Sequence, residues 1–150
     1  MLENEINKMK TIQDMIKDLT GVTVEQDKIS KYLASETLDL EETNLKNANL
    51  WSANLEYANL WSANLQHANL KNANLWSANL WCAYLQSANL RSANLWCANL
   101  QSANLEYANL RSANLENACL VGTNLENACL LGARITKQQL DQLTVIEENE

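Results

Sequence analysis

A chain of 150 residues has the length of one ordinary domain, and its 47% hydrophobic residues are enough to form a core. No run of 18 apolar residues is present, which excludes a membrane-spanning helix, and the start of the chain lacks a basic segment followed by an apolar stretch. The net charge is −7, and the four cysteines include no CxxC pair. These features predict a soluble cytoplasmic protein that keeps its thiols reduced.

Residues 1–37 are expected to form an N-terminal helical cap. An apolar stripe at helical spacing begins at Leu2 and ends at Leu19, and Gly21 is suited to stop a helix. A second short helix is predicted to follow, because Thr23 and Gln26 have the spacing of a capping box.

Residues 38–135 repeat with a period of five. From Leu40 to Ile135 a large aliphatic residue occupies every fifth position without an insertion, which makes twenty repeats. A small residue, mostly Ala, stands two positions earlier, and Asn usually lies between the two. A period of five would scatter the leucines around an α-helix, so an amphipathic helix is excluded. Short extended units with Ala and Leu on one side and Asn on the other, joined by two-residue corners, fit the pattern.

These repeats resemble the pentapeptide-repeat family, whose motif is A(N/D)LXX. Residues 53–57, Ala-Asn-Leu-Glu-Tyr, and residues 93–97, Ala-Asn-Leu-Trp-Cys, match the motif throughout. The resemblance implies an all-β solenoid, namely a right-handed quadrilateral β-helix with four repeats per coil and about five coils. Leu and Ala would lie inside, and α-helical caps at the N- and C-termini would cover the open ends.

The C-terminal segment, residues 136–150, is predicted to be a capping helix followed by a tail. Thr136 and Gln139 have the spacing of a capping box. Leu140, Leu143 and Ile146 then form an apolar stripe.

Four tryptophans gather into two columns if four repeats make one coil, an arrangement that rests on the resemblance. Trp61 then lies above Trp81, and Trp76 lies above Trp96, with the two columns flanking one face. Two interpretations stay open, because exposed aromatic patches are typical of binding surfaces, whereas stacked aromatics also stiffen a β-structure. The four tryptophans are therefore a hypothetical partner-binding surface.

The same arrangement stacks Lys71, Arg91 and Arg111 into a basic edge. A column of cations can bind an anion, whereas a solvated edge without a function is the simpler interpretation. His67, the only histidine, is expected to be a surface residue. No catalytic residue, cofactor site or metal site is predicted.

The best-known activity of similar proteins is to inhibit or protect DNA gyrase through a β-helix that mimics DNA. A DNA mimic needs an acidic shaft, but residues 40–135 carry 5 Lys and Arg against 6 Asp and Glu. The preferred hypothesis is a non-enzymatic interaction scaffold or regulatory binding protein, as in many similar bacterial proteins, and the gyrase-binding mimic is the alternative. The expected partner is a protein of unknown identity, without membrane or direct nucleic-acid binding. A homodimer seam at Val121 and Leu131 stays open, beside the simpler packing of these residues under the C-terminal helix.

Overall fold

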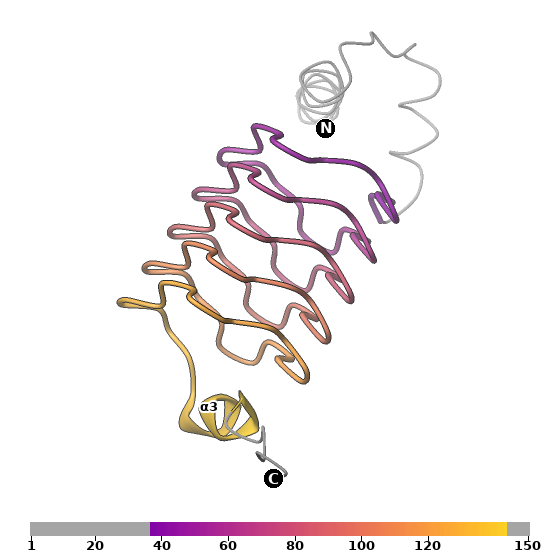
Figure 1. The fold of residues 1–150 in the computed structure, drawn as a ribbon. Helices are drawn as coiled ribbons and strands as arrows, with labels where there is room; N and C mark the ends of the chain where they lie inside the picture. Colours follow the sequence, from indigo (N-terminus) through magenta and orange to yellow (C-terminus); the bar gives the residue numbers. More distant parts are fainter. Residues whose placement is uncertain (1–36, 144–150) are drawn as a thin grey trace, which may run out of the picture.

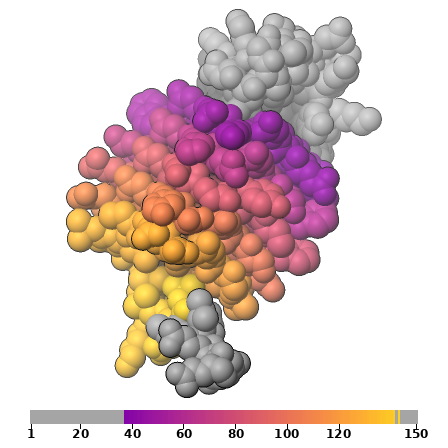
Figure 2. All heavy atoms as spheres, viewed as in Figure 1, coloured from indigo at the N-terminus to yellow at the C-terminus, as the bar shows by residue number. Residues whose placement is uncertain are grey.

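The computed structural model describes residues 37–143, and most of them form a column of stacked coils (Figure 1). Consecutive stretches of the chain form successive bands along this column in the space-filling view (Figure 2). The predicted N-terminal cap, apart from its last residue, and the predicted C-terminal tail from residue 144 lie outside the described residues. Within the described part, no helix is both long enough and apolar enough to cross a membrane.

Backbone bridges join residues twenty positions apart in parallel, so four repeats make one coil. The bridges on one face join Asp39 to Asn59, Asn59 to Asn79, Asn79 to Asn99, and Asn99 to Cys119. The other three faces have the same register, and each repeat contributes a single bridged residue. The predicted vertical alignment of residues twenty apart is confirmed.

Two-residue turns form the four corners of each coil. At one of them, the Ala53 N–H donates to the Leu50 carbonyl at 3.1 Å across Trp51 and Ser52. The second turn residue has positive φ, 54° at Ser52, as a type II turn requires. This conformation costs an L-residue roughly 1–2 kcal/mol, so the stacking must hold it in place. The Ser52 N–H does so by donating to the Lys71 carbonyl of the next coil at 2.9 Å.

The interior of the column contains the Leu and Ala of each repeat, as predicted. Every fifth-position leucine from Leu45 to Leu120 is at most 1% exposed, and the alanines from Ala48 to Ala118 are at most 6% exposed. Burial of each leucine contributes on the order of 1.5–3 kcal/mol. The repeat therefore stabilises the column evenly along most of its length.

Most of the asparagines between Ala and Leu bond both their own corner and a neighbouring coil. The Asn74 Oδ1 accepts from the Trp76 backbone N–H at 3.2 Å, which fixes the entry into the turn. The Asn74 Nδ2 donates to the Asn54 Oδ1 at 3.3 Å, and the Asn94 Nδ2 donates to the Asn74 Oδ1 at 3.2 Å. Three faces thus carry a ladder of amides, whereas on the fourth face Tyr84 replaces one asparagine and only Asn124 and Asn104 are joined. The repeat motif alone did not reveal these ladders.

The described chain ends in a short helix, α3 (Lys137–Leu143), at the C-terminal end of the column (Figure 1). The expected capping box is present, since the Gln139 N–H donates to the Thr136 Oγ1 at 3.3 Å and the Thr136 N–H donates to the Gln139 Oε1 at 2.9 Å. The Gln139 Nε2 also donates to the carbonyls of Leu115 at 2.6 Å and Ala118 at 2.8 Å. One buried side chain therefore ties α3 to the end of the column.

Candidate functional site

The four predicted tryptophans lie around one face of the column, which we call the Trp face. Its centre is the amide ladder of Asn59, Asn79 and Asn99, because these residues are bridged to one another. The two corners that flank the ladder carry the tryptophans, which are Trp61 and Trp81 after it in the chain and Trp76 and Trp96 before it. The β-helical register thus brings together residues spread over 36 positions.

The aromatic rings pack along the column axis. Trp61 stacks on Trp81 with ring centroids 5.9 Å apart, and Trp76 packs against Trp96 at 5.7 Å with the rings tilted by 33°. Tyr57 extends the second column, with its ring 5.1 Å from that of Trp76. Sequence reasoning missed Tyr57 because it occupies the second turn position, whereas the tryptophans occupy the first. The contact could have been predicted from the sequence, because Tyr57 stands 19 residues before Trp76 and therefore lies in the same corner, one coil away.

Packing covers the tryptophans unequally. Trp81 is 42% exposed, Trp96 36% and Tyr57 47%, whereas Trp61 and Trp76 are half-buried. The Trp76 Nε1 is buried and has no hydrogen-bond partner. Trp76 therefore has a structural role between Tyr57 and Trp96, and the outer rings Trp81 and Trp96 offer the larger surface to a ligand.

The centre of the Trp face is rigid and uncharged. The Asn79 Nδ2 donates to the Asn59 Oδ1 at 3.2 Å, and the Asn99 Nδ2 donates to the Asn79 Oδ1 at 3.3 Å. The Oδ1 of Asn79 also accepts from the Trp81 backbone N–H at 3.3 Å. A partner would therefore meet a flat face whose side chains lose little freedom on binding.

Acidic groups lie at the N-terminal end of the Trp face. The Asn59 Nδ2 donates to the Asp39 Oδ1 at 3.0 Å and to the Glu41 Oε2 at 3.1 Å. Both carboxylates are exposed, and Glu42 beside them is exposed too. The face therefore combines an uncharged aromatic middle with a negative rim at one end.

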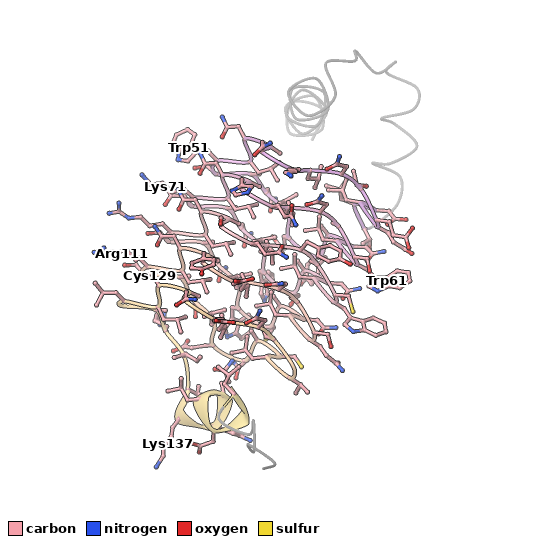
Figure 3. The ribbon with its side chains drawn as sticks, in the orientation of Figure 1. Trp51, Trp61, Lys71, Arg111, Cys129 and Lys137 are labelled. Atoms are coloured by element: carbon pink, nitrogen blue, oxygen red, sulfur yellow. The ribbon has the colours of Figure 1, made fainter. Side chains whose placement is uncertain are left out.

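The basic edge lies one corner away from the column of Trp76 and Trp96, and diagonally opposite the column of Trp61 and Trp81. Lys71 follows Trp61 by ten residues, which is half a coil, so the two side chains leave diagonally opposite corners. Figure 3 shows Trp51, Lys71 and Arg111 projecting on one side of the column and Trp61 on the other. Trp51, the fifth tryptophan, is 59% exposed and stands at the top of the basic column, outside the Trp face.

Side chains that could bind a metal ion do not converge in the described residues. No group of three His, Cys, Asp or Glu side chains there could hold a metal ion. His67 is an exposed turn residue with φ of 58°. Cys82, Cys97, Cys119 and Cys129 are free thiols, and Cys119 and Cys129 lie on opposite faces.

The family model of pentapeptide repeats matches this chain in eight copies, over residues 39–72, 68–106 and 97–132. The chain therefore belongs to the pentapeptide-repeat family. Proteins of this family form right-handed quadrilateral β-helices and are generally structural or binding proteins. The register of twenty residues per coil is that of such a four-sided helix.

Solved structures of the same family resemble the chain. A pentapeptide repeat protein of the Arabidopsis thaliana thylakoid lumen is 28% identical over 74% of this chain and 77% of its own, with a TM-score of 0.69. A pentapeptide repeat protein of the cyanobacterium Cyanothece is 34% identical over 75% of this chain and 97% of its own, with a TM-score of 0.37. HetL of the cyanobacterium Nostoc, involved in heterocyst differentiation regulation, is 31% identical over 64% of this chain and 63% of its own, with a TM-score of 0.40. Among curated proteins, none matches the chain significantly.

Proposed function

We propose that this protein is a non-enzymatic scaffold whose Trp face binds a protein partner. One observation carries the proposal, namely that Trp81, Trp96 and Tyr57 keep 42%, 36% and 47% of their surface exposed on a single face. Aromatic side chains gathered in one patch are the residues that most often dominate protein–protein binding energy. The family's general character as structural or binding proteins is consistent with the same function.

The aromatic packing favours binding over a purely structural role for the outer rings. Stacking alone accounts for Trp61 and Trp76, which are half-buried within their columns. It does not require Trp81 and Trp96 to be large and exposed, because a smaller residue would leave less apolar surface in water. Their pre-ordered rings lose little side-chain entropy when a partner covers them.

The test removes the exposed rings and compares the variant with a matched control. The variant is Trp81→Ser/Trp96→Ser, and the control is Trp51→Ser/Tyr107→Ser, which removes exposed aromatics from the other two corners. Wild-type protein captures candidate partners from a lysate of the source cell, and each candidate is then purified and titrated against all three proteins. The Trp-face variant should lose at least about tenfold in affinity, while the control loses less than about twofold.

Circular dichroism and thermal melting of each variant show whether the column is intact. Equal weakening by both variants, or a binding loss that parallels a loss of melting temperature, would contradict a specific Trp face. Capture of gyrase subunits whose binding does not depend on the tryptophans would favour the DNA-mimic alternative.

The proposal extends to the location and the oligomeric state of the protein. We expect a cytoplasmic location, which fractionation of the source cell tests. Light scattering distinguishes a monomer from a homodimer.

A further inference from the structure

The basic edge consists of three cations that have no partner within the described chain. Lys71, Arg91 and Arg111 occupy the first turn position of three successive coils. None of their side chains forms a salt bridge or hydrogen bond with another described residue, whereas Arg134 pairs with Glu116 at 2.7 Å. The donors of the basic edge are therefore free for a ligand.

Backbone hydrogen bonds fix the three residues in register. The Asn72 N–H donates to the Arg91 carbonyl at 3.0 Å, and the Ser92 N–H donates to the Arg111 carbonyl at 2.9 Å. The cations thus leave the column at intervals of about 4.8 Å, the spacing of hydrogen-bonded strands. The adjoining turn residues, Asn72, Ser92 and Ser112, are uncharged, so no carboxylate lies beside the cations in their own corner. In the neighbouring corners of the same coil, Glu106 and Glu116 flank Arg111, and Glu116 is paired with Arg134.

This arrangement is unfavourable for the column by itself. Like charges on adjacent strands destabilise a β-structure, and each added cation raises the repulsion. Residues 37–143 contain 6 Lys and Arg, and 3 of these stand in this one column. An alternation of Lys or Arg with Glu would have removed the repulsion. An anion supplied by a binding partner would offset the repulsion among the three cations.

We propose that the basic edge binds a short, extended, carboxylate-rich segment of a second protein. The three cations span two coil intervals, roughly 10 Å, which about three residues of an extended chain also span. The guanidinium groups of Arg91 and Arg111 match a carboxylate in geometry, because each presents a planar pair of donors. Trp51, 59% exposed at the top of the same column, is placed to contact an apolar residue beside the acidic run.

Charge favours an acidic peptide over a nucleic acid as the ligand. The whole chain carries a net charge of −7, which repels any polyanion at longer range. Duplex DNA, with one charge per roughly 1.7 Å, is repelled most, and three cations release too few counterions to overcome this. A short acidic peptide is repelled less, because all of its carboxylates can lie against the basic edge.

The experiment titrates the full chain with fluorescent hexaglutamate at about 50 mM salt and follows anisotropy, because screening is weak there. The variant Arg91→Gln/Arg111→Gln should weaken binding at least about tenfold. The control Lys46→Gln/Lys137→Gln removes the same charge from exposed cations outside the edge and should weaken binding less than about twofold. Hexathymidylate is titrated in parallel as a phosphate polymer.

Each result decides the proposal. Binding of hexaglutamate that the edge variant loses and the control keeps supports it, provided that the circular dichroism and melting temperature of the variant match the wild type. Absence of binding, or equal weakening by both variants, overturns it. Tighter binding of hexathymidylate that the edge variant loses would assign the edge to phosphates instead. Trp81→Ser should leave hexaglutamate binding unchanged, because Trp81 lies at the corner diagonally opposite the basic edge.

Discussion

The middle of the column and its last coil contain the same repeat but differ in burial. Leu80 is 0% exposed, whereas Leu130, at the equivalent position of a repeat in the last coil, is only half-buried. The turns differ as well, since the second turn position is Ser102 in the middle and Gly122 one coil below it, both with positive φ. Exposed apolar side chains also gather in the last coil, with Val121 at 49% and Leu131 at 64%.

This difference shows that a repeat is stabilised mainly by its neighbours. A middle coil has a coil on both sides, while the last coil has one on one side and α3 over part of the other. In solenoids the stability is close to a sum of repeat and nearest-neighbour contributions. The same motif should therefore tolerate change near the end and resist it in the middle.

The largest expected effect is the loss of a core leucine. Leu80→Ala should destabilise the protein by about 2–5 kcal/mol, because the cavity lies between two complete coils. Leu130→Ala should cost less than about half as much, since part of the side chain is already in water. Urea denaturation of the two variants beside the wild type measures the difference. Equal losses would mean that the column unfolds without regard to position.

A smaller effect is expected where α3 joins the column. Gln139→Ala removes the Nε2 donor from the carbonyls of Leu115 and Ala118, which should cost about 1–3 kcal/mol. Gln138→Ala changes an exposed residue of the same helix and should have little effect. Hydrogen exchange should show faster exchange in residues 120–135 of the Gln139 variant than in the middle coils. Uniform acceleration along the chain would contradict a local role.

The smallest effect concerns the turns. Gly122→Ser introduces a side chain at φ of 66°, although its Cβ would meet the Ser102 Oγ only at 3.5 Å, an ordinary contact. The conformational penalty, partly offset by the lower entropy of the unfolded chain, should cost about 1 kcal/mol. The reverse change, Ser102→Gly, should shift stability by less than about 1 kcal/mol. Thermal melting of both variants provides the measurement, and a stabilising Gly122→Ser would contradict strain at this turn.

The sequence predicted a large part of the fold because one rule applies at every repeat. A residue inserted between Leu40 and Ile135 would have shifted each later leucine out of its column, and none occurs. The family resemblance implied four repeats per coil, so residues twenty positions apart were expected to lie in one column. This alignment predicted that Trp61 lies above Trp81 and that Lys71 lies beneath Trp51. Tyr57 was missed, because the count did not show that neighbouring turn positions in one corner also come into contact.

The sequence by itself determined which residues lie inside the column and which lie on its surface, since the five-residue period fixes the direction of each side chain locally. Only the tertiary structure decided how much of each surface residue stays exposed, because that depends on contacts between coils. Trp76 and Trp81 occupy equivalent turn positions, yet Trp76 is packed between Tyr57 and Trp96, whereas Trp81 has one aromatic neighbour and stays 42% exposed. The amide ladders and the pairing of Arg134 with Glu116 likewise depend on side-chain geometry across the coils.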